Sequence, residues 1–330
     1  MQTIQWQNVF GSDLKAIKQH RYCTEYHIEN HSGTGKLIQY EVLPGIQLTY
    51  NLFKLDIRPN NNITNINIIE INHCMEGRYE CEFKKNDYIY LNEGDLSISN
   101  FSCKKISSNF PLGYFKGISI IIYLDEAVIS IKKMKLPDSI DLYKLMKKLC
   151  VKGHCFILRA RNEIKHIFSQ PYPVKEELYR TYHQIKVIEL LLFLSSNNIS
   201  EQNQERPYYS RKQVTITKQI RDHLITHMNK RITIEEMSKK YGIGATTLKS
   251  CFKGIYGTTI GNYMHYHRIK TAAFMLQNSY DSIAVIAAKV GYENQSKFAA
   301  AFKKITGMCP SEYRKSKHKQ PVVHKKVSFI

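Results

Sequence analysis

The chain has 330 residues, of which 43% are hydrophobic and 23% charged, and its formal net charge is +20 at pH 7. This length allows two or three domains. The longest apolar stretches, residues 118–124 and 187–194, are too short to cross a bilayer, and the first 20 residues lack the apolar core of a signal peptide. We therefore expect a cytoplasmic protein with no membrane partner.

The positive charge is concentrated in the last third of the chain. Residues 211–330 hold 22 Lys and Arg against 6 Asp and Glu, whereas residues 1–210 hold 26 against 22. A basic domain of this size favours a polyanionic partner, above all a nucleic acid. The end of the chain, residues 317–330, is a basic tail that could add phosphate contacts.

Eight cysteines are scattered along the chain, and none forms a CxxC motif. Buried free thiols are the expectation, and redox or metal sensing is the alternative. One possible zinc site consists of Cys23, His27 and His31, which would share a face if residues 23–31 formed a helix. Since no fourth ligand is evident, we expect no metal and no cofactor.

Alternating polar and apolar residues predict β-strands in the region from residue 46 to 123. The clearest is residues 78–83, in which Tyr79, Cys81 and Phe83 alternate with charged residues. Further strands are expected at residues 47–55, 64–71, 88–91, 96–99 and 117–123. Several short, evenly spaced strands are typical of an antiparallel sandwich or small barrel.

His73 and Glu76 precede a turn within this region and could line a ligand pocket. The alternative is that His73 is a structural histidine at the end of a strand. The chain lacks an HxH motif at this position, which disfavours a catalytic metal and hence an enzyme.

Residues 138–197 have helical periodicity. The stripe in residues 176–195 must be buried, either in a dimer interface, which we favour, or against the strands. It comprises Leu178, Tyr182, Ile185, Ile188, Leu191 and Leu192. The polar residues that follow, 195–204, are typical of a linker.

Residues 234–257 and 283–307 repeat one pattern: a short helix, a glycine, and a second helix with an i,i+4 apolar pair. The turn glycines are Gly242 and Gly291, the pairs are Leu248/Phe252 and Phe298/Phe302, and each copy ends in a capping glycine. This pattern predicts two helix-turn-helix motifs, whose second helices enter the major groove. Residues 258–277 would form the helix that connects them.

The polar faces of these second helices carry side chains that suit DNA. Lys neutralises phosphate, Asn and Gln pair with adenine, and Thr or Ala can contact a thymine methyl group. The candidate DNA-binding residues are Thr246, Thr247, Lys249, Ser250, Lys253, Asn294, Gln295, Ser296, Lys297, Ala300 and Lys303. Two solvated helical hairpins without a DNA partner are the alternative.

Residues 214–316 resemble the DNA-binding domain of the AraC/XylS family of transcription regulators. The resemblance is carried by Gly242, Leu248, Phe252, Gly257, Arg268, Ile269, Gly291, Tyr292, Phe298, Phe302, Gly307, Pro310, Tyr313 and Arg314. It implies a seven-helix domain with recognition helices near residues 244–256 and 294–306. An Arg is common in the family where this chain has Ala300, which suggests an AT-rich half-site.

The resemblance extends, on weaker similarity around residues 73–77 and 94–95, to the cupin-like sensor domain of these regulators. The implied fold class is α+β, with an N-terminal antiparallel β-barrel and an all-α C-terminal domain. The expected divisions are a sensor domain at 1–135, a helical dimerisation region at 136–197, a linker at 198–213, the DNA-binding domain at 214–316 and the tail at 317–330.

The function expected from these observations is ligand-responsive transcription regulation, with activation through RNA polymerase contact as the family implies. Promoter DNA, a small-molecule effector and a second copy of the chain are the expected partners. Motifs in the DNA-binding half are similar to the siderophore-responsive branch of the family, which makes a siderophore one candidate effector. The alternatives are a metal-dependent cupin enzyme or redox sensor fused to a DNA-binding domain, and an architectural DNA binder without a ligand.

Overall fold

The computed structural model describes residues 10–55, 57–58, 67–83, 87–100, 105–134, 140–150, 155–169, 174–196 and 209–316. The chain divides into two compact units between residues 208 and 209. The basic tail and residues 198–208 of the expected linker lie outside the described residues. Helix α6 begins at Arg211, three residues before the domain start expected at 214.

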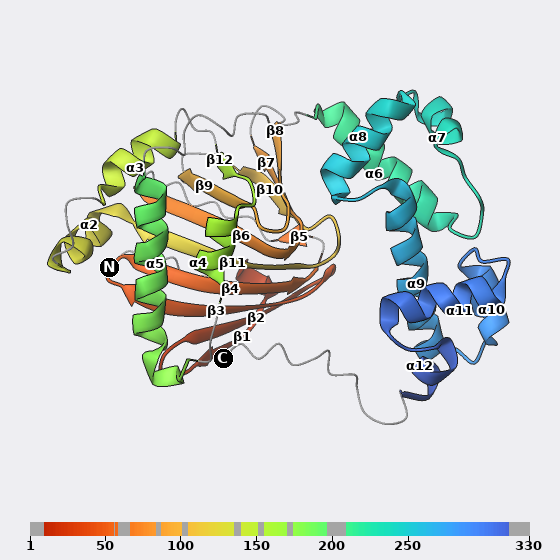
Figure 1. The fold of residues 1–330 in the computed structure, drawn as a ribbon, viewed down its shortest axis with the longest axis horizontal. Helices are drawn as coiled ribbons and strands as arrows, with labels where there is room; N and C mark the ends of the chain where they lie inside the picture. Colours follow the sequence, from red (N-terminus) through yellow and green to blue (C-terminus); the bar gives the residue numbers. More distant parts are fainter. Residues whose placement is uncertain are drawn as a thin grey trace. The chain divides into compact units, whose positions relative to one another are not determined.

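The first unit contains two sheets (Figure 1). The larger has the strand order β1-β2-β3-β4-β11-β6-β9-β12, and the smaller has the order β5-β10-β7-β8. All the pairings are antiparallel. The bounds are β1 Leu14–Gln19, β2 Thr24–Asn30, β3 Gly33–Leu43, β4 Ile46–Lys54, β5 Ile57–Arg58, β6 Ile68–Gly77, β7 Tyr79–Phe83, β8 Asp87–Leu91, β9 Leu96–Asn100, β10 Lys105–Asn109, β11 Phe115–Tyr123 and β12 Phe156–Leu158.

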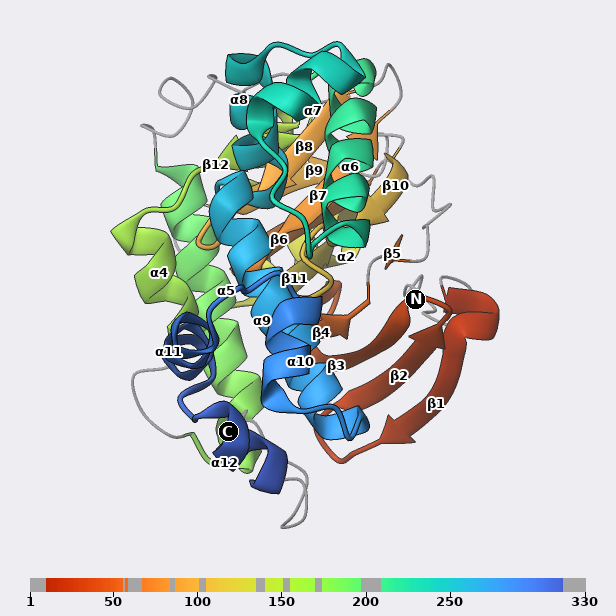
Figure 2. The ribbon, with the colours of Figure 1, turned by 90° about the vertical axis from the view of Figure 1, so that its right-hand side faces the viewer.

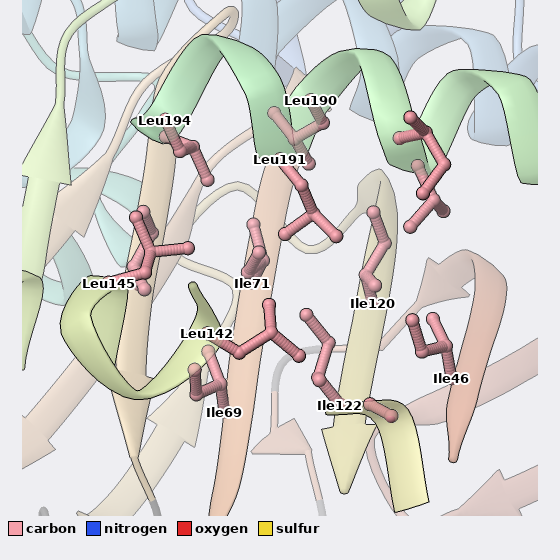
Figure 3. Packing of buried hydrophobic residues seen from close by; sticks show 14 of the residues in the cluster. Ile46, Ile69, Ile71, Ile120, Ile122, Leu142, Leu145, Leu190, Leu191 and Leu194 are labelled. Carbon is pink, nitrogen blue, oxygen red and sulfur yellow. The ribbon is translucent and has the colours of Figure 1, made fainter. Parts of the chain in front are cut away.

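Helices cover one face of the larger sheet. Their bounds are α2 Leu124–Lys133, α3 Leu142–Leu149, α4 Asn162–Phe168 and α5 Tyr179–Ser195, with short 3₁₀ turns η1 Gly11–Asp13 and η3 Glu176–Leu178. Alternate residues of the central strands, such as Ile69, Ile71 and Ile120, pack against Leu142 and Leu191 of these helices (Figure 3). The helices expected in residues 136–197 therefore share one core with the sheet.

The opposite face of the larger sheet is turned toward the smaller sheet. A second core joins Phe53 and Cys74 of the larger sheet to Tyr79, Cys81 and Leu91 of the smaller one. The first unit thus has three layers: helices, the eight-stranded sheet and the four-stranded sheet.

Several expectations for this unit need correction. The larger sheet is open in the described residues, with β1 and β12 at its edges, so a closed cupin-like barrel is not confirmed. The proposed helix for the zinc ligands Cys23, His27 and His31 is wrong because residues 24–30 form strand β2. Residues four apart in a strand lie on the same face but about 13 Å apart, at roughly 3.3 Å per residue, so these side chains cannot meet at one ion as they would on a helix.

The second unit consists of seven helices within residues 209–316, as the resemblance implied (Figure 2). They are α6 Arg211–Thr226, α7 Ile234–Tyr241, α8 Ala245–Tyr256, α9 Ile260–Asn278, α10 Ile283–Lys289, α11 Gln295–Thr306 and α12 Pro310–Ser316. In the part of the chain that the structure describes, no helix has the length and apolar composition needed to span a membrane.

Candidate nucleic-acid interface and the polar face of the first unit

The first helix-turn-helix motif is formed by α7 and α8. Gly242 ends α7 with a φ of 63°, a conformation that glycine adopts at little cost. The buried side of α8 presents Leu248, Phe252 and Ile255, of which Leu248 packs with Met237 of α7 and Leu224 of α6. The apolar spacing in the sequence therefore fixes which side of α8 faces outward.

The outward side of α8 carries most of the DNA-binding candidates of the first motif. Thr246, Lys249, Ser250 and Lys253 are exposed, and Thr247 is half-buried. Gly257 ends the helix with a φ of 74°, as expected for a capping glycine. The exposed face is polar and basic, which suits a phosphate backbone and base edges.

The second motif, α10 and α11, has the same construction with a different start. Gly291, with a φ of 85°, forms the turn, and Phe298 and Phe302 are fully buried beneath α11. Asn294 caps α11: its side-chain oxygen accepts a hydrogen bond from the backbone N–H of Lys297. The N-cap residue of α8 is Gly244, which has no side chain and therefore cannot cap the helix in this way.

The exposed side of α11 unites the candidates of the second motif. Asn294, Gln295, Ser296, Lys297, Ala300 and Lys303 are all exposed. The cap uses one lone pair of the Asn294 oxygen and fixes the orientation of this amide, so Asn294 is less free than Gln295 to turn both of its groups toward a base. Gln295 is the amide with both groups available for adenine.

Helix α9 joins the two motifs (Figure 2). Its 19 residues correspond to about 28 Å at 1.5 Å per residue. Its buried residues Met264, Ile269, Ala272 and Leu276 are divided between the cores of the two motifs. The length of this connecting helix is close to the roughly 34 Å between successive major grooves.

These features define the second unit as a double helix-turn-helix domain. Residues 237–316 match the family described as a helix-turn-helix domain. The transcriptional activator AarP of Providencia stuartii is 30% identical over 112 residues, which are 33% of this chain and 83% of that protein. The chain belongs to the AraC/XylS family of transcription regulators.

Other relatives match over a smaller part of their length. The regulator YdiP of Escherichia coli (strain K12) is 32% identical over 125 residues, 38% of this chain and 41% of that protein. The chain thus spans about two fifths or less of the first curated relatives it matches. Among solved structures, the C-terminal domain of AraT from Geobacillus stearothermophilus is 25% identical, with 33% of this chain and 94% of that chain covered and a TM-score of 0.30.

In the first unit, the two pocket candidates lie in different surroundings. His73 is buried and stacks on Phe168 of α4, with ring centroids 4.2 Å apart. Its Nδ1 atom lies 3.2 Å from the carbonyl oxygen of Asp95. Burial lowers its pKa to about 4. Glu76 is exposed and forms an ion pair of 3.0 Å with Lys116. The structure therefore does not bring these two side chains together.

Sequence reasoning missed a row of buried polar side chains on the other face of the larger sheet. One residue from each of five neighbouring strands contributes, and the cross-strand partners run Gln39, Thr49, Ser119, Asn72 and Ser97. All five are buried. They lie on the face that carries Phe53 and Ile121, which is the face turned toward the smaller sheet. We call these five residues the polar row.

The hydrogen bonds of the polar row leave acceptors unused. Asn51, next to the row on β4, donates to Ser119 over 2.7 Å, and Ser119 donates to Asn72 over 2.6 Å. Gln47 Oε1, Thr49 Oγ1 and Asn51 Oδ1, all on β4, are buried and have no hydrogen-bond partner among the residues that the structure describes. Buried polar atoms without partners each cost on the order of 1–3 kcal/mol, so a strand that carries three of them is unusual.

The cysteines of the described residues form no disulfide bond with one another. Cys74, Cys81, Cys150, Cys155 and Cys251 are buried, and Cys23 and Cys309 are half-buried. Burial raises the pKa of Cys74 to about 12, which suppresses the reactive thiolate. Within the described residues, no group of three or more His, Cys, Asp and Glu is placed to hold a metal ion.

Proposed function

We propose that this protein is a sequence-specific DNA-binding transcription regulator that reads two successive major grooves with α8 and α11. The observation that carries the proposal is the presence of two exposed polar and basic helix faces, one at each end of α9. Relatives named as HTH-type regulators and activators support it.

The two recognition helices read different features. On α8, the residues that contact bases are Lys249, Thr246 and Thr247, and Ser250 and Lys253 lie on the same exposed face. On α11, Gln295 is the main base-reading residue, Ser296 and Lys297 extend its contact, and Ala300 contacts a thymine methyl group. Lys253 and Lys303 bind phosphate.

The test is the selection of promoter fragments from genomic DNA with the purified full chain. Defined enriched sites with two half-sites about one helical turn apart are the expected result. A fragment of residues 209–330 should retain binding at low salt because the second unit is compact by itself. Enrichment without any shared sequence, together with a steep salt dependence, would instead indicate an architectural DNA binder.

We further propose that the first unit binds a small-molecule effector at the polar row, in a domain related to the cupin-like sensor of the family. The unpaired groups of Gln47, Thr49 and Asn51 support this proposal because they can accept hydrogen bonds from a ligand rich in hydroxyl or amide donors. The five side chains of the row are uncharged, and the buried Glu70 lies two residues from Asn72 on the same face of β6. A siderophore rich in such donors is one candidate.

The proposed mechanism is a population shift. An effector that binds one arrangement of the two units more tightly favours that arrangement, and hence one affinity for DNA. We propose activation through RNA polymerase contact, as for the relatives named activators. Repeating the fragment selection with the low-molecular-weight fraction of a cell extract tests this part, and identical selected sites and affinities in both samples would contradict it.

Helix α5 supports a proposal of dimerisation. Its buried side packs on the sheet through residues such as Val187 and Leu191. Leu178, just before the helix, and Ile185 and Leu192 within it are 55%, 60% and 44% exposed. These three residues are seven apart, the spacing of a helix-to-helix seam.

A metal-dependent cupin enzyme and a redox sensor remain the alternative functions of the first unit. Metal analysis of the purified protein and thiol titration under oxidising conditions distinguish them from effector binding. One equivalent of tightly bound metal, or an oxidation-dependent change in DNA affinity, would favour the alternative in question.

A further inference from the structure

The loop between α6 and α7, residues 227–233, meets the turn of the second helix-turn-helix motif. A Cβ atom on Gly291 would overlap the carbonyl oxygen of Met228, which lies in that loop. Two features therefore favour a glycine at position 291. One is its positive φ of 85°, and the other is the close approach of a segment from the first motif. The two motifs are in direct contact, in addition to their connection through α9.

Arg268 of α9 lies at the same junction. Its Nη2 donates to the carbonyl oxygen of Lys230 over 3.4 Å, and its guanidinium carbon would be 3.1 Å from a Cβ atom on Gly291. One side chain thus contacts the loop of the first motif and the turn of the second. Its half-buried guanidinium fills the corner between three segments.

Apolar packing continues across this junction. Met228 packs against both the core of the first motif and the core of the second. The neighbouring Tyr292 hydroxyl lies 2.9 Å from His265 Nδ1 on α9, which ties the second turn to the connecting helix. Contacts through backbone, apolar and polar groups together hold the two motifs as one body.

We propose that Arg268 is a positioning residue that sets the separation and angle of the two recognition helices. This inference rests on the proposed DNA-binding function. If the two helices form one body, the number of base pairs between the half-sites is fixed, because each added base pair moves and rotates one half-site relative to the other. Without the guanidinium, only α9 and the apolar packing of Met228 would connect the motifs, and other spacings would be tolerated.

The experiment uses the full chain and a series of selected sites with one or two base pairs added or removed between the half-sites. For the wild type we expect an affinity loss of about tenfold or more for one added base pair, in the range of a mismatched site. For Arg268→Met, which keeps the apolar stem, we expect this penalty to fall to about threefold or less. Arg231→Met, at an exposed position of the same loop, should keep the wild-type spacing profile.

Arg268→Lys is the second variant, since it preserves the charge and one donor, and its profile should lie between those of the wild type and Arg268→Met. Circular dichroism and thermal melting establish that each variant is folded. A wild-type spacing profile in folded Arg268→Met and Arg268→Lys overturns the positioning role alone. Failure of the wild type to bind any fragment at any spacing overturns the proposed DNA-binding function, and this inference with it.

Discussion

The side-chain oxygen of Asn294 accepts a hydrogen bond of 2.9 Å from the backbone N–H of Lys297, at the first turn of α11. Two of the proposed DNA-binding residues are thus joined by a bond that also starts the recognition helix. Asn294 therefore acts on DNA recognition partly through the fold of α11.

Replacement of this cap separates the two roles. Asn294→Ala should lower the free energy of unfolding by about 1 kcal/mol, because it leaves the N–H of Lys297 without a side-chain acceptor. Asn294→Ser keeps a capping oxygen and should preserve stability while it removes the amide NH₂ group. Denaturant unfolding and DNA titration of both variants check this, and equal stability of the two would show that the cap contributes little.

Lys249→Ala and Gln295→Ala should each weaken specific DNA binding by about 1–3 kcal/mol, because each removes a proposed base contact. Lys239→Ala, an exposed lysine of α7 outside both recognition faces, is the matched control for loss of charge. Binding is measured on a selected site and on random DNA. If both variants retain wild-type discrimination between these two DNAs, the proposed recognition faces are wrong.

The sequence predicted the second unit well because helix period and glycine position are local signals. Buried Leu248, Phe252, Phe298 and Phe302 repeat every four residues within each copy, and Gly242 marks a turn that requires a positive φ. No comparable signal marked the contact between Arg268 and residues 227–233, since it joins segments that are far apart in the sequence.

The first unit was predicted less completely, for physical reasons. The strands β1 to β3 carry few alternating apolar residues, and β12 has only three residues in a region expected to be helical. Gln47, Thr49 and Asn51 alternate with apolar residues, as on a strand with one solvated face. Only the second sheet, which covers that face, makes them buried, and pairing between sheets is not encoded locally.

Thr49→Val should raise the free energy of unfolding of the ligand-free protein by about 1 kcal/mol, because it replaces an unpaired buried hydroxyl with a methyl group of similar size. The same variant should lose the response of DNA binding to the effector fraction. Thr217→Val is the matched control: the Thr217 hydroxyl is buried but donates to the carbonyl oxygen of Gln213 over 2.7 Å, so its loss should destabilise. Destabilisation of both variants would indicate that Thr49 is satisfied in the native protein.

Stability should fall when the pH is lowered from 6.5 toward 4, in part through His183. Burial lowers the pKa of His183 to about 4, and its Nε2 lies 3.1 Å from the Tyr50 hydroxyl within a group of tyrosines, Tyr40, Tyr50, Tyr179 and Tyr182. The unfolded chain binds a proton near pH 6.5, whereas the folded protein keeps this ring neutral. The contribution of the neutral His183 ring to the free energy of unfolding is fully present above pH 6.5, and about 2 kcal/mol of that free energy is lost at pH 5.

Chemical unfolding at pH 7 and pH 5 measures this loss. His183→Gln should reduce the difference between the free energies of unfolding measured at pH 7 and pH 5. His73, whose pKa is also lowered to about 4, contributes a similar amount to that difference. The double variant with His73→Gln should therefore show the flattest pH dependence. An unchanged pH dependence in the double variant would assign the acid sensitivity to other groups.

Charge placed on the exposed stripe of α5 should prevent self-association. Ile185→Lys combined with Leu192→Lys introduces two lysines one heptad apart on the side of the helix that faces away from the sheet, and in a dimer seam they would face apolar residues or each other. The buried residues of α5 are untouched, so the monomer should keep its fold.

Sedimentation equilibrium should give a dimer for the wild type and a monomer for the double variant. Ile129→Lys, at a 57% exposed position of α2, is the control and should remain a dimer. A wild type that is monomeric at micromolar concentration, or a double variant that still dimerises, would place any dimer interface elsewhere on the chain.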